Sequence, residues 1–241
     1  MTRPQAVAGR RVRAVVFDLD DTLVPQGPWL AGAWSAVAEA GSVVGRALGI
    51  AVDAGALEQA LLADAAAGSA RGGIIDRAVA AVAPDLPVAP LIAAFRSFRA
   101  PSLAPYEGVV AALERCREVV PVGLVSDGDP DIQRAKLAAA GLDGAFDAVV
   151  LSDELGREYR KPHPLPFTTM LETLGTDPDE AAFVGDRPDK DIAGAAAVGM
   201  VAVRVRTGEY ADAPDVVAPD ADVADATDAV AWLIDGLVID R

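Results

Sequence analysis

The chain has 241 residues, and its 52% hydrophobic content suffices for one large core or for a core with a smaller second domain. Its 36 acidic and 21 basic residues give a net charge of −15, which excludes nucleic acid and anionic membrane surfaces as expected partners. Cys116 is the only cysteine, which excludes an intramolecular disulfide and a thiolate metal cluster, and we expect a cytoplasmic protein.

Short runs rich in valine alternate with longer helical patterns along most of the chain. The candidate strands span residues 13–17, 119–125, 148–151, 181–184 and 200–205. Such alternation is typical of βαβ units, and strands that are apolar on both faces are typical of a buried parallel sheet. We therefore predict an α/β fold with a doubly wound, Rossmann-like parallel sheet.

Residues from about 29 to 99 lack strand patterns. Alanine and leucine with interspersed acids and arginines favour helix here, and the sequence is interrupted at Gly72-Gly73 and by the prolines of residues 84–90. Prolines in residues 24–28 and 101–105 mark two junctions, because proline disfavours continued helix. We predict a core formed by residues 1–23 and 105–241, into which residues 24–104 are inserted as a helical domain.

Candidate functional residues lie where the predicted strands end, which is where open parallel sheets bind ligands. They are Asp18, Asp20, Asp21 and Thr22 after the first strand, Ser126 and Asp127 after the second, Lys161 before a later helix, and Gly185, Asp186, Asp189 and Asp191 after the fourth strand. Each group alone could be a solvated turn or a helix cap. Three acids within four residues repel one another, however, so the first group favours a bound cation.

These segments, in this order, resemble the motifs of the haloacid dehalogenase (HAD) superfamily, whose members are mostly phosphohydrolases. Asp18, Asp20 and Thr22 match its Asp-x-Asp-x-Thr motif, Ser126 its strand-ending Ser or Thr, Lys161 its lysine, and Gly185, Asp186 and Asp191 its Gly-Asp segment with a later Asp. Residues 24–104 are similar to its helical cap of the first type. The resemblance implies a Mg²⁺-dependent phosphomonoester hydrolase of the phosphatase branch, acting on a small phosphorylated metabolite.

The resemblance implies a role for each acid. Asp18 is the expected nucleophile, which forms an aspartyl-phosphate, and Asp20 is the expected general acid and base. Mg²⁺ is expected to bind the carboxylates of Asp18 and Asp186 and the backbone carbonyl of Asp20. Asp191 is a candidate for the outer shell of the metal, with capping or solvation of the helix at residues 192–198 as its alternative.

A second group of residues is expected to bind phosphate. Lys161 supplies positive charge against the nucleophile and the transferred group, while Ser126 and Asp127 hold its oxygens through a hydroxyl and a neighbouring backbone N–H. Asp129 followed by Pro130 already supplies an N-cap and first residue for the next helix, which leaves Ser126 available for phosphate.

Three other residue groups receive structural interpretations. Asp21 is interpreted as an exposed loop acid, and His163, between two prolines, as a turn residue. Arg71, Arg77, Arg96, Arg99, Trp29 and Trp34 are candidates for contacts to the leaving group, although solvated helix faces and a packed helical core explain them more simply.

Several alternatives to a phosphatase share part of this pattern. A dehalogenase attacks carbon and usually lacks the second acid of the first motif, so Asp20 favours phosphoester chemistry. A response-regulator receiver lacks a helical insert of this size. A phosphomutase acting on a sugar phosphate would share all the core residues, and a catalytically silent phosphate-binding module is the alternative from another class.

Overall fold

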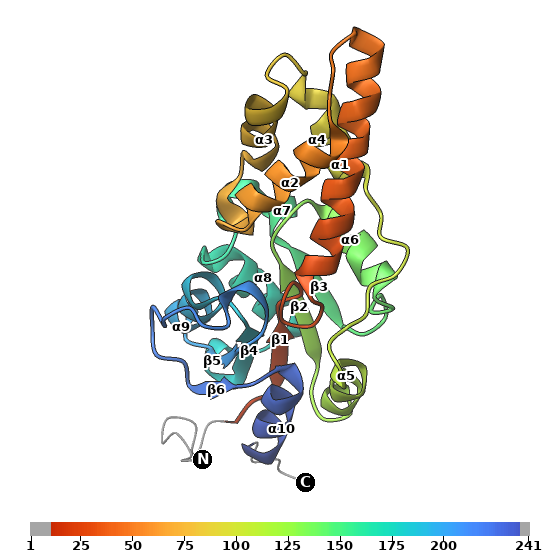
Figure 1. Cartoon of the computed structure of the whole chain (residues 1–241). Helices are drawn as coiled ribbons and strands as arrows, with labels where there is room; N and C mark the ends of the chain where they lie inside the picture. The colour runs from red at the N-terminus through yellow and green to blue at the C-terminus, as the bar shows by residue number, and fades with distance from the viewer. Residues whose placement is uncertain (1–10, 237–241) are drawn as a thin grey trace. The chain divides into compact units, whose positions relative to one another are not determined.

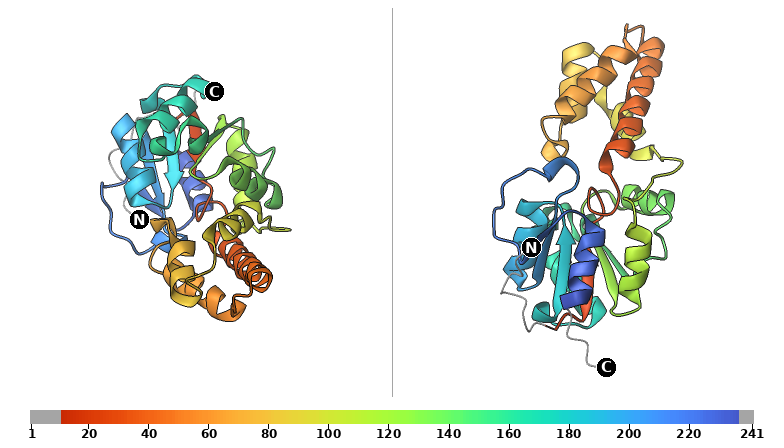
Figure 2. Two further views of the ribbon diagram at one scale, coloured as in Figure 1. Left: turned by 90° about the horizontal axis from the view of Figure 1, so that it is seen from above. Right: turned by 60° about the horizontal axis from the view of Figure 1, so that its bottom comes forward.

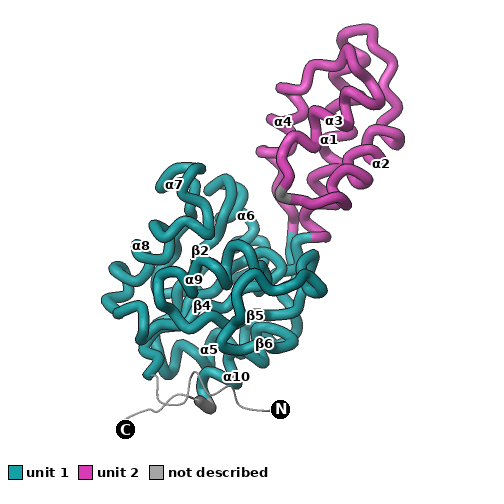
Figure 3. The backbone as a smooth tube through the Cα atoms, turned by 90° about the vertical axis from the view of Figure 1, so that its left-hand side faces the viewer, with its two compact units in different colours: residues 1–26, 102–241 teal, residues 27–101 magenta. Residues whose placement is uncertain are grey.

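A computed structural model describes residues 11–236. The chain divides into two compact units (Figure 3). Unit 1 consists of residues 1–26 and 102–241, and unit 2 consists of residues 27–101. Among the described residues, no helix combines the length and the apolar character that crossing a bilayer requires.

Unit 1 is built around a six-stranded sheet in the order β3-β2-β1-β4-β5-β6 (Figure 1). Its strands are β1 (Ala14–Phe17), β2 (Val122–Ser126), β3 (Ala148–Leu151), β4 (Ala181–Gly185), β5 (Val201–Val205) and β6 (Ala221–Val223). All neighbouring strands are parallel, and every residue of β1, β2, β4 and β5 is buried. The predicted α/β fold with a doubly wound parallel sheet is confirmed.

Helices cover both faces of this sheet. They are α5 (Val109–Arg117), α6 (Pro130–Ala139), α7 (Ser152–Leu155), α8 (Pro164–Leu174), α9 (Ala193–Val198) and α10 (Ala226–Gly236). α8 and α9 pack against one face, where Phe167 and Met170 share a buried cluster with Val16 and Phe183, and α5 and α10 cover the other face (Figure 2). Burial on both faces explains why the strands appear in the sequence as continuous apolar runs.

The strands differ from the prediction by more than one residue at two places. The strand predicted at residues 119–125 begins only at Val122, because the N–H groups of Val119 and Val120 donate to the Cys116 carbonyl at the end of α5. The edge strand β6 was not predicted, since it has three residues with the exposed Asp222 at its centre. Neither its length nor its polarity distinguishes it from a loop.

Unit 2 is helical and has its own core. Its helices are α1 (Gln26–Leu48), α2 (Ala54–Ala65), α3 (Ile74–Val82) and α4 (Val88–Ser97). The chain breaks where the glycines and prolines predicted it, since Gly73 precedes α3 with φ 64° and Pro87 precedes α4. Leu57, Leu61 and Leu91 are fully buried at the centre of the core.

The tryptophans of unit 2 belong to this core. Trp29 and Trp34 are 3% and 4% exposed, and both rings contact Phe95, at centroid distances of 5.3 and 4.8 Å. Arg77 forms a two-bond ion pair with Asp64, at 2.8 and 2.6 Å. For these three residues, packing within unit 2 is a sufficient explanation.

A buried arginine organises the loop between β5 and β6. Arg204 is fully buried, pairs with Asp215 and donates from Nη2 to the carbonyls of Tyr210 and Ala213 at 2.9 and 2.7 Å. Arg206, two residues later, also pairs with Asp215 but keeps 31% of its side chain exposed. The two arginines therefore share a partner but differ in burial.

We expect Arg204→Met to lower the free energy of unfolding by about 1–3 kcal/mol, because two carbonyls and Asp215 would lose a buried charged donor, while Asp215 and the Ala213 carbonyl would keep Arg206. The matched change Arg206→Met should cost at most about 1 kcal/mol, as is usual for half-exposed pairs. Urea denaturation followed by circular dichroism measures both. Equal losses in the two variants would contradict the role given to Arg204.

Candidate functional site

Three buried carboxylates meet where β1 and β4 end. Asp18 directly follows β1, Asp186 directly follows β4, and Asp191 lies in the helical turn η4 (Pro188–Ile192). They are 7%, 2% and 1% exposed, and one oxygen of each lies within 4.8 Å of the others. They meet because β1 and β4 are adjacent, with Phe17 paired to Val184.

Short contacts fix the two loops that carry these acids. The Asp186 N–H donates to the Thr22 hydroxyl at 3.1 Å, and the Arg187 N–H donates to Asp191 Oδ2 at 3.0 Å. A Cβ at Gly185 would lie 2.5 Å from Asp191 Cγ, so only glycine at this position lets Asp191 approach the end of β4. The close approach of Asp191 thus explains why residue 185, directly before Asp186, is a glycine.

Lys161 lies among these carboxylates and is 3% exposed. Its Nζ is 2.5 Å from Asp18 Oδ1 and 2.8 Å from Asp191 Oδ1, and it donates to the Val125 carbonyl at 3.1 Å. Burial opposes the charge of this ammonium, but Asp18, Asp191 and Asp127 outweigh burial and raise the pKa of Lys161. Lys161 therefore remains charged at neutral pH.

One lysine does not neutralise three buried carboxylates. Burial raises the pKa of Asp18 to about 7, against the opposing effect of Lys161 and with a further increase from the charge of Asp191. Burial, with repulsion from Asp191 and Asp18, raises the pKa of Asp186 to about 10. A divalent cation would remove this repulsion, and carboxylate oxygens are the ligands that hard divalent cations prefer. Asp18, Asp186 and Asp191 could therefore hold such a metal.

The Asp20 carboxylate has different partners. It accepts from Lys136 Nζ at 2.6 and 2.8 Å and from Gln133 Nε2 at 2.9 Å, and the same Nε2 donates to Ser126 Oγ at 2.6 Å. Gln133 and Lys136 were not predicted from the sequence. Their spacing of three residues places them on one helix face, but the pattern does not tell that this face turns toward Asp20.

Asp127, a predicted phosphate ligand, has its carboxylate surrounded by donors. It accepts from Ser152 Oγ at 2.8 Å, from the Lys161 N–H at 3.0 Å and from Lys190 Nζ at 3.0 Å. Burial opposes its ionisation, but Lys161 and Lys190 outweigh burial and lower the pKa of Asp127. A carboxylate held ionised repels phosphate, so the backbone N–H is the group of Asp127 suited to bind it.

The interpretation of Asp21 as an exposed loop acid is wrong. Asp21 is 9% exposed, has φ 59°, and accepts from the N–H groups of Gln26 and Glu209 at 2.8 and 3.2 Å. Its carbonyl accepts from the Thr207 hydroxyl. A Cβ at Gly208 would lie 2.1 Å from Asp21 Cγ, so this acid packs against the loop after β5, a contact that is remote in sequence.

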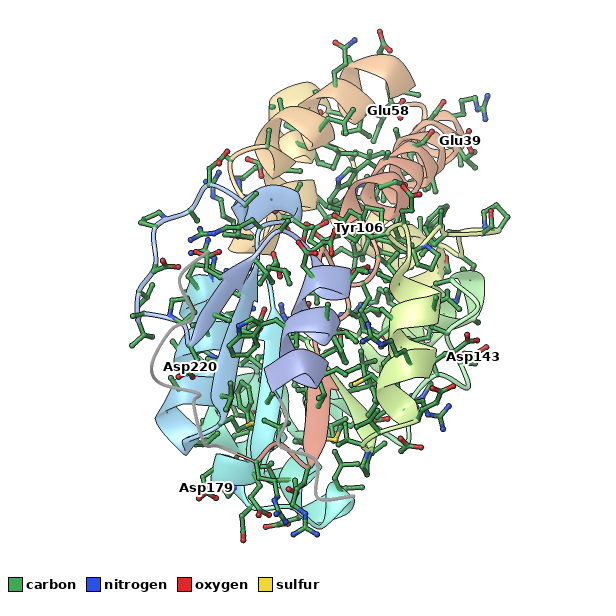
Figure 4. The ribbon with its side chains drawn as sticks, turned by 90° about the horizontal axis from the view of Figure 1, so that it is seen from below. Glu39, Glu58, Tyr106, Asp143, Asp179 and Asp220 are labelled. Carbon is green, nitrogen blue, oxygen red and sulfur yellow. The ribbon has the colours of Figure 1, made fainter. Side chains whose placement is uncertain are left out.

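Other candidates lie outside this group of acids. Asp189 is half-exposed and pairs with Arg187 at 2.9 Å. His163 caps α8, because its Nδ1 accepts from the Leu165 N–H at 3.2 Å, as expected of a turn residue. Asp143 and Asp179 are exposed at the periphery of unit 1 (Figure 4). Exposed acidic residues such as these need no functional explanation, whereas the buried acidic residues require one.

Residues 12–199 match the family of haloacid dehalogenase-like hydrolases, a range that contains every site residue predicted from the sequence. A glyceraldehyde 3-phosphate phosphatase of Methanopyrus kandleri is 41% identical over 126 residues, which are 52% of this chain and 53% of that relative. A phosphoserine phosphatase of Thermus thermophilus is 40% identical over 131 residues, which are 54% of this chain and 51% of that relative. The chain thus spans about half the length of these curated relatives.

Similar folds occur among solved structures. A HAD phosphatase from Thermococcus onnurineus has a TM-score of 0.66 and 25% identity, over 95% of this chain and 100% of that one. A 2-haloacid dehalogenase from Pseudomonas syringae pv. Tomato has a TM-score of 0.65 and 23% identity, over 93% and 98% of the two chains. At 23% identity, the similarity to the dehalogenase shows only that the two proteins share a fold.

In the presence of a chelator, the carboxylate cluster should make the free energy of unfolding depend on pH. The native pKa values of Asp18 and Asp186, about 7 and about 10, exceed the ordinary value of 3.8. The native state therefore retains protons that the unfolded chain loses, so the free energy of unfolding should fall as pH rises from about 4 through 7 toward 10. Urea denaturation at a series of pH values measures this slope.

Saturating Mg²⁺ should raise the stability and reduce the slope, because it binds the native cluster. Asp186→Asn should weaken both effects, whereas the matched change Asp189→Asn, outside the cluster, should leave them intact. A metal-free protein whose stability stayed constant over this pH range, or a Mg²⁺ effect unchanged in Asp186→Asn, would contradict the metal site.

Proposed function

The chain belongs to the haloacid dehalogenase-like hydrolase family, and on that premise we propose that it is a Mg²⁺-dependent phosphatase. Its substrate is a small phosphorylated metabolite, and Asp18 forms an aspartyl-phosphate intermediate. The observation that carries the proposal is the buried Asp18 carboxylate, 2.5 Å from Lys161 and converging with Asp186 and Asp191. The phosphatases among the relatives support the same reaction class.

In the first step, a carboxylate oxygen of Asp18 forms a bond to phosphorus while the bond from phosphorus to the leaving oxygen breaks. Lys161 orients Asp18 through Oδ1 and supplies positive charge to the transferred group. Asp20 gives a proton to the leaving oxygen. Asp18, Asp186 and the Asp20 carbonyl would hold Mg²⁺, with Asp191 in its outer shell, and the bound ion would supply the positive charge that lets a phosphate dianion approach a carboxylate.

In the second step, Asp20 takes a proton from water as that water attacks phosphorus, and the bond from phosphorus to Asp18 breaks. Inorganic phosphate leaves, and Asp18 is regenerated as a carboxylate. Asp20 thus serves first as acid and then as base, so its carboxylate must reach both the leaving oxygen and the water. The Ser126 hydroxyl and the backbone N–H of Asp127 bind the phosphate oxygens throughout.

The substrate is selected by a separate part of the chain in this proposal. Residues 24–104 act as a helical cap on a catalytic core formed by residues 1–23 and 105–241. The helical character of this insertion, between β1 and α5, supports the assignment. The presence of Asp20 favours phosphoester chemistry over the dehalogenation named for one of the structural neighbours. The enzyme acts in the cytoplasm, where metabolites of this class occur.

The proposal is tested by phosphate release from a panel of phosphorylated metabolites, beside p-nitrophenyl phosphate. Activity should disappear in chelator, return with Mg²⁺ and return poorly with Ca²⁺, whose larger and looser oxygen shell misplaces the nucleophile. Asp18→Asn should lower turnover by more than about 10³-fold, because an amide does not attack phosphorus. The matched change Asp189→Asn should retain activity.

Activity that persisted in excess chelator, or in Asp18→Asn, would contradict the proposal. A phosphomutase would instead require a sugar bisphosphate and would convert the substrate without net release of phosphate. Rapid quenching and mass measurement of the intact chain would detect the added phosphoryl group on the wild type and not on Asp18→Asn.

The division of labour between the two acids of the first motif predicts a dependence on the leaving group. Asp20→Asn should slow turnover of an alkyl phosphate by about 10²–10⁴-fold, the usual contribution of general acid and base catalysis. The loss should be smaller for p-nitrophenyl phosphate, because its phenolate departs without a proton. His163→Ala should change little. An equal loss for both esters in single-turnover phosphorylation would exclude Asp20 as the acid.

A further inference from the structure

Two buried polar residues of α6 take no part in these chemical steps. Gln133 and Lys136 are 2% and 4% exposed. Long polar side chains are rarely buried to this extent, and a buried lysine in particular requires a charged partner. Their positions three residues apart place both on one face of α6. We use the name α6 pair for Gln133 and Lys136.

The α6 pair holds both oxygens of the Asp20 carboxylate. Lys136 Nζ donates to Oδ1 at 2.6 Å and to Oδ2 at 2.8 Å, and Gln133 Nε2 donates to Oδ2 at 2.9 Å. A carboxylate held at both oxygens loses strong, charge-assisted hydrogen bonds if it rotates about its last torsion. The Asp20 side chain remains 18% exposed. The α6 pair therefore holds its carboxylate from within the protein, while its exposed part stays accessible to a ligand.

Gln133 also reaches the predicted phosphate site. Gln133 Nε2 donates its second hydrogen to Ser126 Oγ at 2.6 Å. Because Lys136 Nζ already donates to both oxygens of Asp20, these oxygens act as acceptors, and the group of the Gln133 amide that faces them is therefore its nitrogen. The amide hydrogen occupies one lone pair of the Ser126 oxygen, which leaves the hydroxyl hydrogen to donate to a phosphate oxygen.

The helix that carries the pair is anchored beside the site. α6 begins at Pro130, directly after the loop that follows Ser126, and Asp129 caps it by accepting from the Asp131 N–H at 3.1 Å. A capped helix with proline at its first position has a well-defined start. Side chains projecting from it are therefore held more rigidly than side chains of the loop itself.

We propose that Gln133 and Lys136 are positioning residues for phosphoryl transfer, with Lys136 orienting the Asp20 carboxylate and Gln133 orienting the Ser126 hydroxyl. The inference rests on the proposed function, since it assigns both residues to steps of that reaction. A group misplaced by about 1 Å can cost about 10²-fold in rate, so orientation of this kind has a measurable effect. A merely structural role would instead affect all substrates equally.

Lys136 is tested by a double-mutant cycle with Asp20, read as single-turnover phosphorylation by an alkyl phosphate and by p-nitrophenyl phosphate. Lys136→Met should slow the alkyl ester by about 10- to 100-fold and the aryl ester much less. In the Asp20→Asn background the same change should have almost no further effect, because Lys136 acts through Asp20. The matched control is Arg134→Met, on the exposed side of α6.

Equal losses for both esters, or the same loss in the Asp20→Asn background, would overturn the role of Lys136. Circular dichroism and thermal unfolding identify a variant that fails to fold. If Lys136→Met does not fold, Gln133→Met keeps the proposal testable, since it leaves the lysine charge in place.

Gln133 is tested without turnover, by calorimetric titration of inorganic phosphate into the Mg²⁺-loaded protein. Gln133→Met should weaken phosphate binding by about 5- to 10-fold, as expected for one misaligned hydrogen bond, whereas Arg134→Met should not. Unchanged binding in Gln133→Met would overturn the role of Gln133. If the wild type bound phosphate in this way but hydrolysed neither ester, the proposed function would fail while the orientation of Ser126 by Gln133 would stand.

Discussion

The burial of Lys161 against the carboxylates of Asp18 and Asp191 is the interaction on which the rest of the site depends. The ammonium of Lys161 lies with Nζ 2.5 and 2.8 Å from the two carboxylates and opposes the effect of burial on the pKa of Asp18. One lysine does not balance the third carboxylate, Asp186, whose pKa is raised to about 10 by burial and by repulsion from Asp191 and Asp18. A divalent cation could remove this repulsion.

The sheet order explains how residues from distant segments reach this cluster. β1 lies between β2 and β4, so the loops after these three strands share one edge of the sheet. Asp18 follows β1, Ser126 is the last residue of β2, and Asp186 follows β4. These three side chains are therefore held at the ends of β1, β2 and β4, strands in which every residue is buried.

A second layer of polar contacts connects the loops to one another and to α6. Thr22 accepts from the Asp186 N–H, Asp127 accepts from the Lys161 N–H, and Gln133 bridges Asp20 and Ser126. Each of these contacts joins residues from different segments of unit 1. Removing one partner would leave a buried polar group unsatisfied, so these residues link the stability of the site to its geometry.

The sequence by itself determined the alternation of buried strands with helices and the helical character of the inserted segment. It also determined the positions of the acids and the serine at strand ends and of the lysine before α8. These features are local, since they depend on apolar runs, on glycine and proline, and on spacing along the chain. Only the tertiary structure decided that Asp191 joins Asp18 and Asp186, that Asp21 is buried against Gly208, and that Gln133 and Lys136 face Asp20. Those contacts join residues from different strands and helices, and a pattern of neighbours along the chain holds no information on which face of one element meets another.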